Sequence, residues 1–153
     1  MNTNELADKL HDNFWSQYGY EVRVTNEVRN DGKKKKTYSR IPGKLSRMHF
    51  SNHVNTAIGI TPSPLINDSV WFGAIDVDTY DMDFEQKKKL IKTAHELRLA
   101  VEQTLSGGFH LWCFISTDTG IAARTMRNYL RHCLNLLGLP GNTEVFPKQE
   151  NGT

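Results

Sequence analysis

The sequence predicts an α+β fold, because stretches with the two-residue alternation of strands and stretches with helical periodicity follow one another along 153 residues. The most regular pattern begins at Val70, after which the predicted elements run strand, helix, strand, strand, helix, strand. Turn and capping residues separate these elements. We therefore expect a single domain overall, built from a small N-terminal α/β module of a helix and a hairpin, residues 1–69, and a βαββαβ unit, residues 70–153.

The N-terminal module opens with a predicted amphipathic helix whose apolar residues are spaced four apart, and Asn2 with Glu5 forms a candidate capping box. The segment 21–28, rich in β-branched residues, is joined to the segment 33–41 by an Asn-Asp-Gly turn, which favours a β-hairpin. Beyond the hairpin, proline and glycine residues predict a less regular connection that runs to about Ser69.

The C-terminal unit contains six predicted elements, each bounded by turn or capping residues. They are a strand at 70–78, a helix capped by Asp83 and Gln86, strands at 99–105 and 109–116, a helix at 121–137 and a strand at about 143–146. This order is the split βαβ arrangement of ferredoxin-like (RRM-like) domains and of many polymerase palms. We expect both helices to cover one face of the sheet, with the first and third strands as central neighbours.

Charge and cysteine usage add weaker indications. The lysine run from Lys33 to Lys36, followed by Arg40, is a local basic stretch in a chain of net charge +2. It fits contact with a nucleic-acid backbone and a solvated hairpin tip equally well. Cys113 and Cys133 lie in apolar segments without metal-binding spacing, so we expect core residues. The composition has the features of a cytoplasmic protein without a membrane partner.

Acidic residues alternate onto one face of the predicted sheet. Asp76 and Asp78 share a face of the first strand, and their Cα atoms would be about 6.5 to 7 Å apart. In the third strand His110 opens on the same face, and the fourth strand, which should flank the first, adds Glu144. Aspartates held by turn amides and a histidine with a structural role are the alternative interpretations. We expect the four side chains to converge on the face that the helices leave open.

Three carboxylates with a histidine suit phosphoryl transfer, in which two metal ions about 3.5 to 4 Å apart activate a 3′-hydroxyl and stabilise the leaving pyrophosphate. We expect His110 to contact the triphosphate. The turn 106–108 would let backbone amides approach phosphate closely, because two of its residues are glycines. Lys148 offers a positive charge and Gln149 a hydrogen-bond donor for the same group.

Three segments together resemble the motifs of the archaeo-eukaryotic primase superfamily, in order and in spacing. They are Asp76-Val77-Asp78, Ser106-Gly107-Gly108-Phe109-His110-Leu111-Trp112 and Glu144-Val145-Phe146-Pro147-Lys148-Gln149. The chain is similar to primase domains of TOTE conflict systems and to CRISPR-associated primase-polymerases, whose third motif is an acid followed by Phe-Pro-Lys-Gln. The resemblance is clearest from about residue 38 to residue 149.

The resemblance implies a primase-polymerase, a template-dependent nucleotidyltransferase that joins NTPs or dNTPs in replication, repair or defence. It implies that three acids are catalytic and hold two Mg²⁺ or Mn²⁺ ions, and that five further residues hold the incoming nucleotide. The acids are Asp76, Asp78 and Glu144, and the nucleotide-binding residues are Ser106, Gly107, His110, Lys148 and Gln149. The implied partners are a single-stranded nucleic-acid template, a nucleoside triphosphate, and a helicase or further C-terminal domain. Family members continue past the third motif with strands that complete the nucleotide pocket, so we expect a truncated core.

Other functions remain open at this point. A nucleic-acid-binding module would use Trp112 and Phe114 on the open face to stack bases, but it does not explain three acids there, because carboxylates repel phosphate unless a metal intervenes. A metal-dependent nuclease also uses clustered acids and a lysine, but Lys148 lies four residues beyond Glu144 rather than two. Nucleotide cyclases share the palm and the paired aspartates, so cyclisation without a template is a further alternative.

Overall fold

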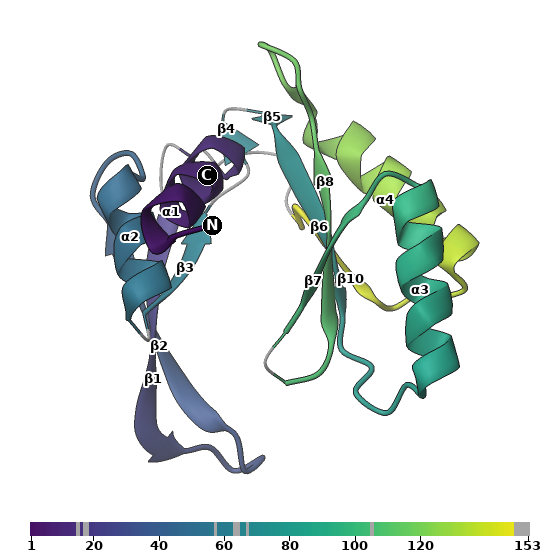
Figure 1. The fold of residues 1–153 in the computed structure, drawn as a ribbon, viewed down its shortest axis with the longest axis horizontal. Helices are drawn as coiled ribbons and strands as arrows, with labels where there is room; N and C mark the ends of the chain where they lie inside the picture. The colour runs from purple at the N-terminus through teal and green to yellow at the C-terminus, as the bar shows by residue number, and fades with distance from the viewer. Residues whose placement is uncertain are drawn as a thin grey trace. The chain divides into compact units, whose positions relative to one another are not determined.

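The computed structural model describes residues 1–14, 16, 19–56, 58–62, 65–66, 68–104 and 106–148. Figure 1 shows its ribbon, which divides into two compact units, Met1–Ser63 and Pro64–Thr153. Each unit has a hydrophobic core of its own and combines helices with antiparallel strands, so the predicted α+β class is confirmed. Among the helices of the described residues, none combines the length and the apolar character that crossing a membrane requires.

The first unit contains two helices and a three-stranded antiparallel sheet in the order β2-β1-β3. Its elements are α1 (Thr3–Asn13), β1 (Gly19–Val28), β2 (Lys34–Ile41), α2 (Arg47–Asn55) and β3 (Gly59–Pro62). The predicted capping box is present, since the side chain of Asn2 accepts from the N–H of Glu5 and the Glu5 carboxylate accepts from the N–H of Asn2. The predicted hairpin is confirmed by the antiparallel pairing of β1 with β2.

The connection after the hairpin is more regular than its proline and glycine content predicts. It contains helix α2 and strand β3, which pairs with β1, so the prediction of a less regular connection to about Ser69 is wrong. Helix α2 buries one side chain, that of Phe50, and therefore has no repeating apolar face that a sequence pattern would reveal. Its start depends on a local signal, because Ser46 is the N-cap and its N–H donates to Nδ1 of His49.

The second unit contains two helices, a four-stranded sheet and a small three-stranded sheet of β4, β5 and β9. Its elements are β4 (Leu65–Ile66), β5 (Ser69–Val70), β6 (Phe72–Val77), α3 (Phe84–Glu96), β7 (Ala100–Gln103), β8 (Phe109–Phe114), β9 (Ile121–Ala122), α4 (Ala123–Leu137) and β10 (Glu144–Phe146). The larger sheet has the order β10-β6-β8-β7, with every neighbouring pair antiparallel. The predicted central position of the first and third strands, β6 and β8, is therefore confirmed, and the fourth strand, β10, flanks the first.

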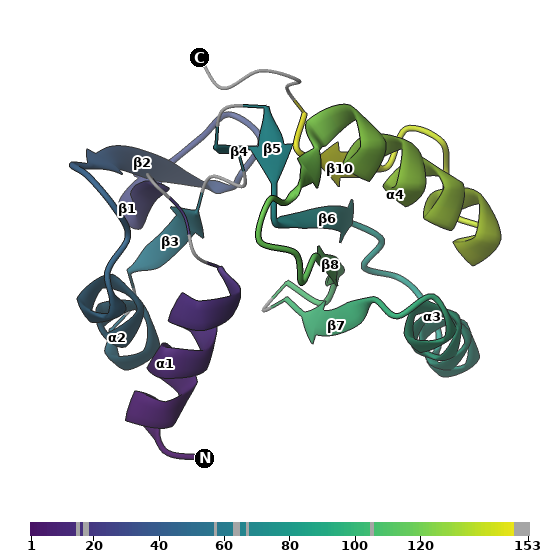
Figure 2. The ribbon, with the colours of Figure 1, turned by 90° about the horizontal axis from the view of Figure 1, so that it is seen from above.

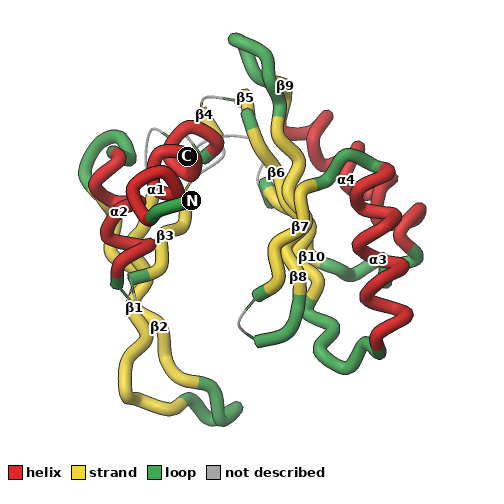
Figure 3. Tube along the Cα trace, in the orientation of Figure 1, coloured by secondary structure: helices red, strands yellow, loops and turns green. Residues whose placement is uncertain are grey.

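Helices α3 and α4 lie on one side of the four-stranded sheet, as the view from above in Figure 2 and the tube in Figure 3 show. The capping box of Asp83 and Gln86 begins α3, and Gly138 ends α4 with a left-handed φ of 67°. Apolar side chains of both helices pack against one face of the sheet. This core includes Ile75, Val77, Leu90, Ala94, Leu111, Met126, Leu130, Val145 and the two free cysteines, Cys113 and Cys133, as predicted. The opposite face of the sheet, which we call the open face, carries the polar residues of the candidate site.

Candidate active site

One residue from each strand of the four-stranded sheet belongs to a row across the open face. In this row Glu144 of β10 is paired with Asp76 of β6, and Asp76 is in turn paired with His110 of β8. Glu102 of β7 is paired with His110 and completes the row. Residues that pair directly on antiparallel strands project from the same face, so the four side chains share the open face. The alternation of the sequence predicted Asp76, His110 and Glu144 in this place.

Asp76 is half-buried near the end of β6, and Asp78 follows the strand with an exposed side chain. The pKa of Asp76 is raised above its usual value, first by burial and next by the negative charge of Asp78. The charge of Glu144 raises it further, whereas His110 and Lys148 lower it. The carboxylates are therefore close enough to repel one another, and a proton or a metal cation between them relieves that repulsion.

His110 lies between two carboxylates. Its Nε2 atom is 3.7 Å from Oδ1 of Asp76, and its Nδ1 atom is 3.0 Å from Oε2 of Glu102. Because an ionised carboxylate only accepts hydrogen bonds, the contact with Glu102 places a proton on Nδ1. The pKa of His110 is raised, first by this hydrogen bond and further by the charges of Glu102, Asp76 and Asp78, although burial opposes the shift. The site therefore favours the cationic imidazolium.

Aromatic rings continue the open face beside this row. The indole Nε1 of Trp112 donates to Oε2 of Glu102 at 2.8 Å, the same oxygen that binds His110. The rings of Trp112 and Phe114 are stacked, with an interplanar angle of 24° and their centroids 6.5 Å apart. Phe114 is 37% exposed, so this part of the face offers an aromatic surface next to the charged row.

The turn between β7 and β8 lies against the end of β6. A Cβ atom at Gly108 would be only 2.5 Å from the backbone oxygen of Val77, so the turn approaches the strand as closely as it does because glycine has no side chain. Gly107 has a φ of 94°, a conformation that other residues rarely adopt. The turn therefore lies against the strand that carries the aspartates, and the approach of its backbone amides to phosphate stays a prediction.

Tyr80 connects this turn to the acidic residues. Its hydroxyl donates a hydrogen bond to Oδ1 of Asp78, and that bond is the largest cause of the raised pKa of Tyr80. A hydrogen bond from the Ser106 side chain acts on the same hydroxyl and lowers the pKa. Ser106, predicted as a nucleotide-binding residue, is therefore linked to Asp78 through the hydroxyl of Tyr80.

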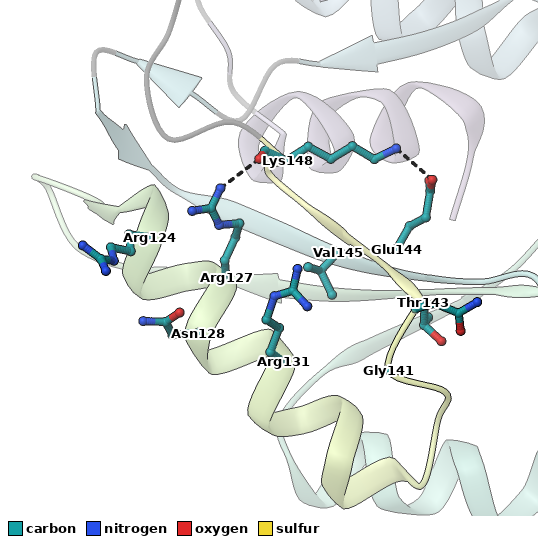
Figure 4. A pocket seen from close by; sticks show the side chains of 10 residues that line it. Arg124, Arg127, Asn128, Arg131, Gly141, Thr143, Glu144, Val145 and Lys148 are labelled. Carbon is teal, nitrogen blue, oxygen red and sulfur yellow. Dashed lines mark hydrogen bonds and ion pairs between the residues drawn. The ribbon is translucent and has the colours of Figure 1, made fainter.

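Lys148 lies beyond the end of β10 and folds back along the strand. Its Nζ atom is 2.8 Å from Oε1 of Glu144 and 4.9 Å from the centroid of the Phe146 ring. Nη1 of Arg127 donates to the backbone oxygen of Lys148 at 2.8 Å and holds this segment against α4, as Figure 4 shows. The last predicted nucleotide-binding residue, Gln149, lies outside the described residues.

The donor set of the site suits a hard divalent cation, because Asp76, Asp78 and Glu144 offer carboxylate oxygens of the kind that Mg²⁺ and Mn²⁺ prefer. In the part of the chain that the structure describes, no three His, Cys, Asp or Glu side chains are grouped so that they could hold an ion as they stand. The carboxylate of Glu144 is turned to Lys148 instead. Binding an ion would require Glu144 to turn toward Asp76, its partner across the strands.

Two residues of the site, Glu102 and Tyr80, were not predicted. For Glu102 a signal exists in the sequence, because the predicted strand 99–105 alternates and its partly buried Val101 packs on the helix side, which leaves Glu102 on the open face. Tyr80 lies in the loop between β6 and α3, where no periodicity applies.

A comparison with protein families finds a family model that matches almost the whole chain. The family model described as TOTE conflict system, Archaeo-Eukaryotic Primase domain matches residues 8–151. The match contains all three motif segments and extends toward the N-terminus well beyond residue 38, where the motifs alone make the resemblance clearest. No curated protein matches the chain.

Proposed function

Because the chain belongs to the archaeo-eukaryotic primase domain family of TOTE conflict systems, we propose that it is the catalytic core of a template-dependent primase-polymerase. Membership of this family indicates a nucleotidyltransferase or primase-like role. The proposed reaction joins NTPs or dNTPs along a single-stranded nucleic-acid template. The observation that carries the proposal is the pairing of Glu144, Asp76 and His110 across three adjacent strands, with Asp78 just beyond.

The second unit would act as an RRM-like polymerase palm. The strand order β10-β6-β8-β7 and the two helices on one face support this assignment, since both belong to the ferredoxin-like arrangement. The open face of such a sheet is then available to the reacting groups. A fold of this kind hosts many functions, so the assignment depends on the side chains of the open face rather than on the topology.

Asp76, Asp78 and Glu144 would hold two divalent cations, Mg²⁺ or Mn²⁺. When bound, these ions supply activation of the 3′-hydroxyl and neutralisation of charge on the triphosphate. The pKa of Asp76 is raised first by burial and then by the charges of Asp78 and Glu144, and the second cause supports this role, because a cation would relieve the repulsion between these carboxylates. Without a cation the same charges would repel a nucleotide.

In the proposed reaction the 3′-hydroxyl oxygen attacks the α-phosphorus and gives its proton to solvent water, while the bond from the α-phosphorus to the oxygen that bridges to the β-phosphate breaks and pyrophosphate leaves. His110 would bind the triphosphate through Nε2, because Glu102 already occupies Nδ1 and the cationic ring is favoured. Lys148 would add a positive charge on the other side of Asp76. Ser106, at the tip of the neighbouring turn, would offer a hydroxyl donor to the same nucleotide.

Primer extension tests this function. The purified chain is incubated with primed and unprimed single-stranded templates, Mg²⁺ or Mn²⁺, and labelled NTPs or dNTPs, and the products are resolved by length. We expect products that require the template and that disappear in the double variant Asp76→Asn, Asp78→Asn. The matched control Asp12→Asn, Asp118→Asn removes the same charge from exposed positions and should extend like the wild type.

Extension that persists in the Asp76→Asn, Asp78→Asn variant would contradict the assignment of the acids. A cyclic nucleotide formed without any template would favour cyclisation over polymerisation. Circular dichroism of each variant checks that its fold is intact.

A further inference from the structure

A polar groove lies between helix α4 and strand β10, at the edge of the four-stranded sheet (Figure 4). Its volume is about 490 Å³. The lining residues are mainly basic or polar and come from both elements. They include Arg124, Arg127, Asn128 and Arg131 on α4, and Thr143 and Lys148 on the side of β10.

Acidic residues are absent from the segment of the sequence that contains α4. The segment 119–143, which contains all of α4, has no Asp or Glu, although the chain as a whole has nearly as many acidic as basic residues. The acid that lines the groove is Glu144, and its carboxylate is occupied by Lys148 at 2.8 Å. Within the described residues, neither Arg124 nor Arg131 has an ion-pair partner. Among the described residues, the charges of Arg124 and Arg131 in the groove are therefore not neutralised by an acidic side chain.

The arginines follow one side of the helix. Arg124, Arg127 and Arg131 are three and four residues apart, so they lie above one another along α4, and buried residues such as Met126 and Leu130 anchor the neighbouring side of the helix to the core. At 1.5 Å per residue the row extends over about 10 Å. In a double helix the phosphates of one strand are about 3.4 Å apart along the axis, so a strand in that helical conformation would place about three successive phosphates along the row.

We propose that this groove binds the phosphate backbone of a nucleic-acid strand and guides the strand to the candidate active site. The proposal rests on the proposed function, because Glu144 and Lys148 belong to the site and also line the groove. Guanidinium groups suit phosphate because they donate two parallel hydrogen bonds to it. The row extends past the site along α4, which favours a continuous strand over the compact triphosphate of a free nucleotide.

The test measures binding of a fluorescein-labelled single-stranded oligonucleotide to the full chain by fluorescence anisotropy at several salt concentrations. The variant is Arg124→Gln, Arg131→Gln, in which Arg127 is kept because it holds the backbone of Lys148. We expect about tenfold weaker binding and a salt dependence that is shallower by about 1.4 in log–log slope, for the loss of two phosphate contacts. The matched control Lys88→Gln, Lys89→Gln removes the same charge from exposed positions on α3 and should bind like the wild type.

Unchanged oligonucleotide binding by the arginine variant would overturn the proposal, and so would an equal loss in the α3 control. A loss of affinity for free nucleoside triphosphate with unchanged oligonucleotide binding would also overturn it, and would assign the groove to the nucleotide. The Asp76→Asn, Asp78→Asn variant separates the two proposals, because it should lose extension and keep oligonucleotide binding. If the arginine variant binds the oligonucleotide more weakly but the wild type does not extend primers, the proposed role of the groove is supported and the proposed reaction is contradicted.

Discussion

Replacing Glu102 tests how the histidine of the candidate site is held. One carboxylate oxygen of Glu102 accepts hydrogen bonds from His110 and Trp112, at 3.0 and 2.8 Å. A hydrogen bond to a charged group contributes ~1.5–3 kcal/mol, and because the Glu102 side chain is 53% exposed we expect about 1 kcal/mol for each. Glu102→Ala should therefore lower the free energy of unfolding by about 2 kcal/mol. Glu102→Gln, which keeps an acceptor oxygen without the charge, should lower it by about 1 kcal/mol.

Glu102→Gln should also lower the pKa of His110. The hydrogen bond to Glu102 is the largest of the causes that raise this pKa above 6.5. A histidine whose folded pKa is raised contributes stability that is fully present below its unfolded pKa and is lost as the pH rises through the folded pKa. The wild type and Glu102→Gln should therefore differ most in free energy of unfolding below pH 6.5. The difference should shrink as His110 of the wild type loses its proton.

Urea denaturation at a series of pH values measures the free energy of unfolding, and an NMR titration of the histidine rings in metal-free protein measures the pKa of His110. Glu96→Gln is the control, because it removes the same charge from an exposed ion pair with Lys92 at 3.9 Å. It should change the free energy of unfolding by less than about 0.5 kcal/mol and leave the pKa of His110 unchanged. An identical His110 titration in the wild type and Glu102→Gln would refute the role of Glu102.

Two further predictions concern the frame of the site. The Tyr129 hydroxyl donates to the backbone oxygen of Leu97 at 3.1 Å, so Tyr129→Phe should cost about 0.5–1 kcal/mol of unfolding free energy. Burial raises the pKa of Tyr129 from 10.0 to about 12, so between these values the wild type should lose stability with rising pH more steeply than Tyr129→Phe does in urea denaturation. Gly108→Ala should cost about 1–3 kcal/mol, because the added Cβ would meet the oxygen of Val77 at 2.5 Å. Gly141→Ala, with nothing within 4 Å of the added atom, should cost less than about 0.5 kcal/mol, and equal melting of the two glycine variants would contradict the argument from contact.

Local patterns predicted both helices and the four strands of the larger sheet in the second unit, because each of these elements carries its own signal. The short strands β4 and β9 were not predicted, and the helix predicted at 121–137 begins at Ala123, after β9. Asp83 caps α3 and Gly138 ends α4, as their positions in the sequence indicate. The predicted strand 70–78 is instead divided at Trp71 into β5 and β6. The division depends on partners that are distant in the chain, since β5 pairs with β9 whereas β6 pairs with β8 and β10, and no local pattern contains that choice.

The candidate site was predictable to the level of faces and strands, but not to the level of contacts. Alternation places Asp76, His110 and Glu144 on the open face because the period of a strand is two residues. It does not specify rotamers, and the contacts of Glu144 with Lys148 and of Glu102 with His110 depend on rotamers chosen by tertiary neighbours. The strand that carries Glu102, β7, was part of the predicted fold, but Glu102 itself was not among the predicted site residues.

The ion pair between Glu144 and Lys148 bears directly on the proposed reaction, because both residues are assigned other partners there. Glu144 would turn to a metal ion, and Lys148 would turn to the triphosphate. Their side chains are 52% and 55% exposed, so the pair contributes at most about 1 kcal/mol and is readily broken. A divalent cation held beside Asp76 would attract Glu144 more strongly than one ammonium group does, and the released Lys148 ammonium would then be available to an incoming anion. In the proposed reaction, metal binding and nucleotide binding would therefore favour each other, since each would remove one partner of the same ion pair.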